Sequence, residues 1–202
     1  MMFKSILIAN RGEIARRLIK SARRLGIKTY AVYSEVDKHS MHTKEADVAV
    51  CIGPAESKKS YLNIKKVIEV AGENKIEAIH PGYGFLSENY LFAKKVEASG
   101  ITFIGPSWKS IKAMGNKNNA KEIISSANIP LVSGFLVKKE KPVENKKKAK
   151  EIGFPVIAKA AAGGGGKGMR VVYNESDLQD SIEAVTREAQ SSFKDDEVII
   201  EK

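Results

Sequence analysis

The sequence predicts an α/β protein with two parts: a Rossmann-like parallel-sheet N-terminal domain and, after it, a smaller α+β domain. In residues 5–104, short apolar runs alternate with amphipathic stretches, a pattern typical of βαβ units and a parallel sheet. From about residue 130, strand-like and helical segments surround a glycine-dense stretch at 161–168. The composition, 43% hydrophobic and 29% charged, is that of a globular chain.

The first domain is predicted to span residues 1–106. Residues 5–9 form a continuous apolar run, as in a buried parallel strand. Residues 12–25 place their apolar side chains on one helix face and stop at Gly26. Ser87 is a candidate cap for a helix that begins at Glu88. The other expected strands lie at 29–33, 46–52, 77–80 and 101–104, and the other helices at 63–71 and 88–98.

A polar helical connector is predicted at 107–129, and a second domain at 130–202. Its expected strands are 131–137, 155–160, 169–173 and 198–201, and its expected helices are 143–151 and 176–192. The lysine-rich run at 138–150 contains no aromatic residues that would stack on bases, so we interpret it as a solvated turn and helix face. Because the chain ends inside a strand pattern, we expect it to be truncated.

Bulk properties exclude several classes of protein. The chain has no run of eighteen apolar residues and no signal-peptide core, so we expect no membrane partner. The net charge of +10 is spread over many segments, and we expect no nucleic-acid partner. The single cysteine, Cys51, suggests a reducing, cytoplasmic location. His39 and His42 lie in a polar connecting segment without a ligand cluster, so no metal site is predicted.

The glycine-dense segment formally matches the G-x-G-x-x-G pattern. A strand rather than a helix is expected after it, and this argues against a dinucleotide fingerprint. A P-loop is disfavoured because Ala161 stands where its first glycine should be and Gly168 where its Ser or Thr should be. A lid between two strands remains, in which backbone amides and a lysine contact phosphates. A glycine-rich linker or a tight hairpin is the structural alternative. The candidate phosphate-binding residues are Gly163, Gly164, Gly165, Gly166, Lys167 and Gly168.

Three further parts of the sequence are considered as ligand-binding sites because of the residues around them. Lys159 lies in an otherwise apolar strand, where burial is unfavourable without an anion such as a phosphate; an exposed strand face is the alternative. Glu201 and Lys202, judged from the residues alone, are surface charges at a strand end. Residues 80–88 follow a strand at the sheet edge where α/β proteins bind ligands, and form either a structural turn or an active-site loop.

Together these segments closely resemble the N-terminal portion of the biotin carboxylase family, a branch of the ATP-grasp enzymes. The resemblance covers essentially the whole chain. It rests on IANRGEIA at 8–15, KSYLN at 59–63, HPGYGFLSEN at 80–89, FIGP at 103–106, MGNK at 114–117, GFPV at 153–156 and GGGGKGMR at 163–170. One departure is Asn116, where many members carry Asp.

The resemblance implies a pre-ATP-grasp N-terminal domain followed by an ATP-grasp lid subdomain. Lys117 and Lys159 match lysines that contact ATP phosphates, and Gly165 and Gly166 fall in the loop that closes over them. Glu201 and Lys202 match the strand that begins the contacts to adenine. The residues that match the loop facing bicarbonate and biotin are Tyr83, Gly84 and Glu88.

The resemblance also implies a reaction. Bicarbonate attacks the γ-phosphate of Mg²⁺-ATP to give carboxyphosphate, and the carboxyl group passes to biotin on a carrier protein or domain. The implied partners are that carrier and a carboxyltransferase, with a homodimer for the full-length enzyme. The family's magnesium ligands and general base lie beyond residue 202, so we expect no catalytic or metal-binding residue here and no activity of the chain alone. The alternatives are another ATP-grasp ligase, similar to carbamoyl-phosphate synthetase, or a non-catalytic nucleotide-binding or assembly module.

Overall fold

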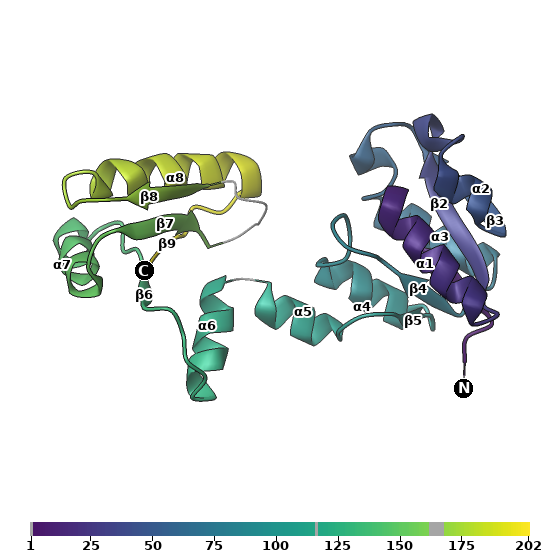
Figure 1. The fold of residues 1–202 in the computed structure, drawn as a ribbon, viewed down its shortest axis with the longest axis horizontal. Helices are drawn as coiled ribbons and strands as arrows, with labels where there is room; N and C mark the ends of the chain where they lie inside the picture. Colours follow the sequence, from purple (N-terminus) through teal and green to yellow (C-terminus); the bar gives the residue numbers. More distant parts are fainter. Residues whose placement is uncertain (1, 116, 162–167) are drawn as a thin grey trace. The chain divides into compact units, whose positions relative to one another are not determined.

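The computed structural model describes residues 2–115, 117–161 and 168–202 (Figure 1). The chain forms two compact units, Met1–Lys112 and Ala113–Lys202. The division follows Lys112 because Trp108 and Ile111, in helix α5 (Trp108–Met114), pack against the core of the first unit. Within the described residues, no helix is long and apolar enough to cross a membrane.

The first unit contains a five-stranded, fully parallel sheet in the order β3-β2-β1-β4-β5. Its strands are β1 (Ser5–Ile8), β2 (Lys28–Ser34), β3 (Val48–Gly53), β4 (Ala78–His80) and β5 (Thr102–Phe103). The strand order reverses direction between β1 and β4. In open α/β sheets such a reversal opens a ligand crevice at the carboxyl ends of the strands.

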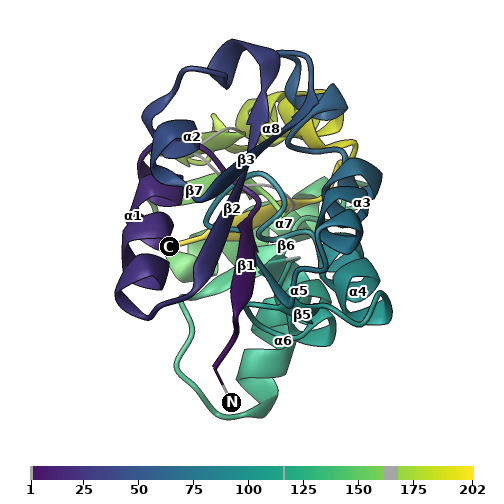
Figure 2. The ribbon, with the colours of Figure 1, turned by 90° about the vertical axis from the view of Figure 1, so that its right-hand side faces the viewer.

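Helices cover both faces of this sheet, as Figure 2 shows. Alternate residues of β1 point to opposite faces. On one face Ile6 and Ile8 pack with α1 (Gly12–Arg24). On the other face Leu7 packs in a larger core with α3 (Ile64–Glu73) and α4 (Tyr90–Ala98). The predicted Rossmann-like architecture is confirmed.

The start of α4 differs from the prediction. The helix begins at Tyr90 rather than Glu88, and its cap is Asn89, whose side chain accepts a hydrogen bond from Phe92 N at 3.0 Å. The backbone N–H of Asn89 in turn donates to the carbonyl of Leu86 at 3.1 Å. Ser87 therefore belongs to the preceding turn, and its predicted role as a cap is wrong.

The segment between β2 and β3 also differs. It was expected to be a polar connection, but it holds a 3-10 turn (Glu35–Asp37) and the short helix α2 (Met41–Glu45). The helix buries His42, which is 1% exposed and whose Nε2 lies 3.3 Å from the carbonyl oxygen of Val32. A second 3-10 turn, Ser57–Lys59, precedes α3.

The second unit contains a four-stranded antiparallel sheet in the order β6-β9-β7-β8. Its strands are β6 (Gly134–Leu136), β7 (Val156–Ala160), β8 (Met169–Val172) and β9 (Val198–Glu201), and its helices are α6 (Lys117–Ser126), α7 (Pro142–Ile152) and α8 (Leu178–Phe193). Strand β8 directly after the glycine-dense segment confirms that no helix follows it. Strand β6 is shorter than the predicted strand at 131–137.

One face of this sheet carries the core of the second unit. Side chains from α7 and α8 pack there against alternate residues of the strands, namely Val156, Ala158, Val172, Val198 and Ile200. Because strand side chains alternate, Lys159 and Glu201 lie on the opposite face. Two residues that sequence patterning treated separately thus share one surface.

The lysine-rich run forms α7 and the turn before it, as predicted. Glu144 accepts ion pairs from Lys138, Lys141 and Lys148 at 3.0, 3.5 and 3.0 Å. The hydrogen bonds from Lys148 and Lys138, together with their charges, lower the pKa of Glu144 to about 2. Part of the positive charge of this run is therefore balanced within the unit.

Candidate functional site

Three charged side chains meet on the face of the second sheet that lies opposite its helices. Glu201 on β9 accepts an ion pair from Lys159 on β7 at one carboxylate oxygen and from Lys121 on α6 at the other. Glu201 is 8% exposed. Burial disfavours its charged form, but the two lysines hold its pKa below the usual value. We call Lys121, Lys159 and Glu201 the Glu201 cluster.

An apolar surface adjoins this cluster. In the antiparallel register, Lys159 lies opposite Met169 and Ile157 lies opposite Val171, so these four side chains share one face. Met169 and Val171 are 51% and 50% exposed although both are apolar. The face thus combines ionic groups near β9 with uncovered apolar groups on β8.

Lys117 lies where β7 ends. Its Nζ donates to the carbonyl oxygens of Ala160 and Ala161 at 3.3 and 3.4 Å, and its backbone N–H donates to Ala161 O at 3.3 Å. Gly168, at the other end of the glycine-dense segment, accepts a hydrogen bond from Ala160 N at 2.9 Å and has a φ of +65°. The first residue of α6 is therefore held at the end of β7, where Ala160 also pairs with Gly168.

The predicted phosphate contacts of Gly163, Gly164, Gly165, Gly166 and Lys167 lie outside the described residues, as does Asn116. Lys202 lies within them. Its Nζ donates to Gly153 O at 2.8 Å and its backbone N–H to Ser133 O at 3.0 Å. Its amine is thus directed at Gly153 and not at the Glu201 cluster.

The first unit holds the second group of predicted residues. The loop after β4 is bound by Asn10, which is 3% exposed and whose Nδ2 donates to Pro81 O at 2.7 Å and to Tyr83 O at 2.8 Å. Tyr83 is 62% exposed, and its hydroxyl donates to Glu13 at 3.3 Å. Gly84 has a φ of +66°. Because β1 and β4 are neighbours, the residues that follow them meet at the strand-order reversal.

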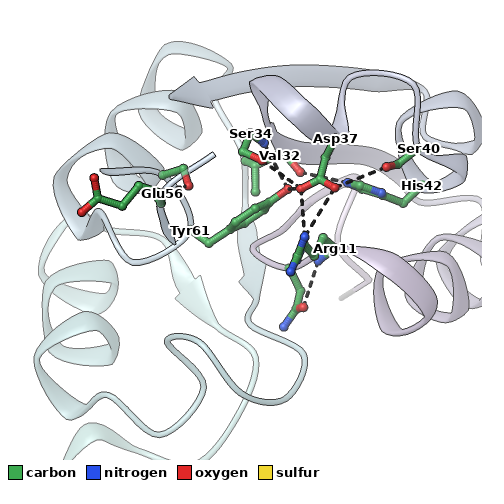
Figure 3. A network of polar contacts seen from close by, with 10 residues as sticks. Arg11, Val32, Ser34, Asp37, Ser40, His42, Glu56 and Tyr61 are labelled. Carbon is green, nitrogen blue, oxygen red and sulfur yellow. Dashed lines mark hydrogen bonds and ion pairs between the residues drawn. The ribbon is translucent and has the colours of Figure 1, made fainter. Parts of the chain in front are cut away.

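A polar network lies next to this loop at the same edge of the sheet (Figure 3). Asp37 accepts hydrogen bonds from the hydroxyls of Tyr61 at 2.7 Å and Ser34 at 2.9 Å, and an ion pair from Arg11 at 3.3 Å. Burial opposes the charge of Asp37, but these donors keep its pKa below the usual value. Burial and then the hydrogen bond to Asp37 raise the pKa of Tyr61 to about 12. The Tyr61 ring stacks on Phe85 with 4.9 Å between centroids.

Residues 2–111, more than half of the chain, match the family model described as "Biotin carboxylase, N-terminal domain". The chain belongs to the biotin carboxylase family. Residues 116–202 match the model described as "Carbamoyl-phosphate synthase L chain, ATP binding domain". The two matched ranges correspond closely to the two structural units.

Curated relatives of this biotin carboxylase chain are subunits of biotin-dependent carboxylases. It is 49% identical over 197 residues to the mitochondrial methylcrotonoyl-CoA carboxylase subunit alpha of Mus musculus. It is 48% identical over 200 residues to the mitochondrial propionyl-CoA carboxylase alpha chain of the same species. The alignments cover 98% and 99% of this chain but only 28% of each relative.

Solved biotin carboxylase structures share the fold. The biotin carboxylase–β-γ-ATP complex from Campylobacter jejuni has a TM-score of 0.93 at 47% identity, covering 100% of this chain and 45% of that one. The biotin carboxylase domain dimer of 2-oxoglutarate carboxylase from Hydrogenobacter thermophilus, with MgADP, ADP and bicarbonate, has a TM-score of 0.93 at 46% identity. That match covers 100% of this chain and 44% of the other.

Some residues of this biotin carboxylase chain were missed by sequence reasoning. Asn10 lies in a motif that carried the resemblance, but its hydrogen bonds to the β4 loop join positions 71 and 73 residues apart in sequence. Asp37 lay in a segment interpreted as a polar connection. Lys121 is one lysine among many in a polar helix, and no local signal marks it.

Glu88 is exposed in the turn before α4. It belongs to the same loop as Tyr83 and Gly84, but no contact between Glu88 and these two residues is described. The structure also contains no group of three or more His, Cys, Asp or Glu side chains arranged for a metal, as far as its described residues go.

Proposed function

We propose that this chain carries the nucleotide-binding part of a biotin carboxylase, which uses Mg²⁺-ATP and bicarbonate to carboxylate biotin. The observation that carries the proposal is the surface formed by the Glu201 cluster and the apolar side chains beside it. It lies in the unit that matches an ATP-binding domain. The C. jejuni and H. thermophilus structures were solved with a nucleotide, which supports the same conclusion.

The residues of this surface fit a nucleotide chemically. Ile157, Met169 and Val171 offer an apolar face on which a planar base can lie. Lys159 and Lys117 provide cations at and beyond the end of β7. Phosphoryl transfer is catalysed mainly by positioning and charge neutralisation. We therefore propose that Lys159, Lys117 and the glycine-dense segment hold the phosphates.

We propose that the β4 loop faces the other two substrates. Tyr83 and Gly84 sit at the carboxyl edge of the parallel sheet, where ligands of α/β proteins bind, and Asn10 holds the loop from behind through two hydrogen bonds. The exposed Tyr83 ring and Glu88 carboxylate are available to bicarbonate and biotin. This loop belongs to the first unit and the nucleotide surface to the second. The role of each is proposed from contacts within its own unit.

The test is calorimetric titration of Mg²⁺-ATP into the chain and into Lys159→Ala. Hydrogen bonds to charged groups are worth about 1.5–3 kcal/mol, so Lys159→Ala should weaken binding by roughly 10- to 100-fold. The matched control is Lys150→Ala, which removes an exposed lysine paired with Glu175 elsewhere in the same unit. Absence of saturable binding to the unsubstituted chain, or equal affinity in both variants, would refute the proposed site.

An ATP-grasp ligase similar to carbamoyl-phosphate synthase is the second candidate, because residues 116–202 match a model of that name. Residues 2–111 match a model specific to biotin carboxylases, and this favours the first proposal. A non-catalytic nucleotide-binding or assembly module is the third candidate. ADP release by the full-length protein, measured with and without bicarbonate and biotin, separates them: dependence on biotin indicates a carboxylase, and nucleotide binding without release indicates a module.

The remaining roles are proposals by relationship. Since the chain spans 28% of its curated relatives, we propose that the whole enzyme acts with a biotin carrier protein or domain and a carboxyltransferase. The H. thermophilus relative is described as a dimer, which supports a homodimer here. Cytoplasmic location stays a prediction.

A further inference from the structure

The Glu201 cluster contains one lysine more than the proposed nucleotide site uses. Lys121 comes from α6 and contacts one carboxylate oxygen of Glu201, while Lys159 comes from β7 and contacts the other. The two lysine side chains are 24% and 23% exposed, and that of Glu201 is 11% exposed. The carboxylate therefore depends on these lysines, because little water reaches it.

The two lysines reach Glu201 from opposite sides. Glu201 on β9 pairs with Gly134 on the β6 side and with Ile157 on the β7 side. At Gly134, an added Cβ would lie 2.8 Å from Glu201 Cγ and 3.2 Å from Lys121 Nζ. Because Gly134 has no Cβ, there is room at this position for the ion pair between Lys121 and Glu201.

Lys159 is on the other side, next to where a ligand is expected. It lies opposite Met169, directly before the strand end that leads into the glycine-dense segment. A phosphate bound at Lys159, as proposed above, would attract this lysine away from Glu201. If Lys159 were the only partner, its departure would leave a nearly buried carboxylate without a counter-charge, which is strongly unfavourable.

We propose that Lys121 is a positioning residue of the nucleotide site: it holds Glu201 and neutralises it, so that Lys159 is free to turn to the phosphates. This inference rests on the proposed function, since it assumes that Lys159 receives a phosphate. It assigns Lys121 a role in affinity for Mg²⁺-ATP without contact to the nucleotide. Glu201 then acts as the resting partner of Lys159 before the nucleotide binds.

The test compares Mg²⁺-ATP affinity, measured by calorimetry, in four forms of the chain. Lys121→Met should weaken binding at least tenfold, because Lys159 must then remain with Glu201. Lys121→Arg keeps the charge and should bind within about threefold of the unsubstituted chain. Lys121→Met combined with Glu201→Gln should recover most of the lost affinity, because an amide needs no counter-ion when Lys159 leaves.

A spectroscopic measurement separates this role from a merely structural one. In the chain with ¹⁵N-labelled lysine, saturating Mg²⁺-ATP should shift the side-chain amine signal of Lys159 clearly more than that of Lys121, which keeps its partner Glu201. A Lys121 signal that shifts as much as that of Lys159, or a double variant as weak as Lys121→Met, would mean that Lys121 contacts the nucleotide itself and would overturn the inference. Unchanged affinity in Lys121→Met would overturn the inference alone, whereas absence of binding to the unsubstituted chain would overturn the nucleotide site as well.

Discussion

Two glycines in the loop after β4, Gly82 and Gly84, allow the cost of backbone strain to be measured apart from the cost of a side-chain clash. Gly82 and Gly84 have φ values of +68° and +66°, so alanine at either position costs about 1 kcal/mol of backbone strain. They differ in their surroundings. A Cβ added at Gly82 would lie 2.7 Å from Asn10 Nδ2, whereas one added at Gly84 meets nothing within 4 Å.

Gly82→Ala must therefore displace the Asn10 side chain. That side chain donates to Pro81 O and Tyr83 O, and each hydrogen bond contributes about 1 kcal/mol net. We expect Gly84→Ala to lower the free energy of unfolding by about 1 kcal/mol, from strain alone. The expected loss for Gly82→Ala is about 3 kcal/mol, from strain and the two lost bonds.

Urea unfolding followed by tryptophan fluorescence measures this difference. Trp108 is the only tryptophan of the chain and packs against the core of the first unit, so the signal reports on that unit. In an Asn10→Ala background the extra loss should vanish, and Gly82→Ala should then cost the same as Gly84→Ala. Equal losses for the two glycine variants in the unsubstituted chain would refute the role of Asn10 as the support of the loop.

Three further predictions follow from other contacts. Burial lowers the pKa of His42 in the folded chain, so below its ordinary pKa of about 6.5 the unfolded chain binds the proton more readily. The free energy of unfolding should be constant above that pH, fall as the pH drops from about 6.5 toward the lower, folded pKa, and level off below the folded pKa, where both states carry the proton. A urea midpoint that changes between pH 7.5 and 5 as much in His42→Leu as in the unsubstituted chain would contradict this. Tyr61→Phe removes the donor at 2.7 Å from Asp37 and should lower the unfolding free energy by roughly 1–3 kcal/mol, measurable by the same fluorescence assay. Gly134→Ala would place a Cβ 2.5 Å from the carbonyl oxygen of Ile200 and should speed amide hydrogen exchange in β9; unchanged exchange would show that the strand pair accommodates a methyl group.

Much of the fold was predictable because its signals are local. Apolar runs and helical periodicity placed the strands of both sheets, and β8 confirmed the prediction that a strand, and not the helix of a dinucleotide fingerprint, follows the glycine-dense segment. The predictions were wrong where a specific side-chain contact determined the local structure. Asn89 rather than Ser87 caps α4, and α2 buries His42 although its sequence is polar.

The candidate site was predictable only in part. Lys159 stood out because a charge inside an apolar strand requires an anion, and the resemblance singled out Glu201. Neither indicated that these two residues pair with each other. Lys121 and Asn10 carried no local signal for their contacts, because their partners lie on other strands and loops.

The sequence by itself determined the class of each unit, the positions of most strands and helices, and the family, since periodicity and motifs depend only on neighbouring residues. Tertiary structure alone decided which charges meet. The register of β9 between β6 and β7 sets Glu201 between Lys121 and Lys159, and the adjacency of β1 and β4 brings Asn10 to the loop after β4. These contacts depend on strand order and register, which result from the packing of the whole unit and not from any single segment.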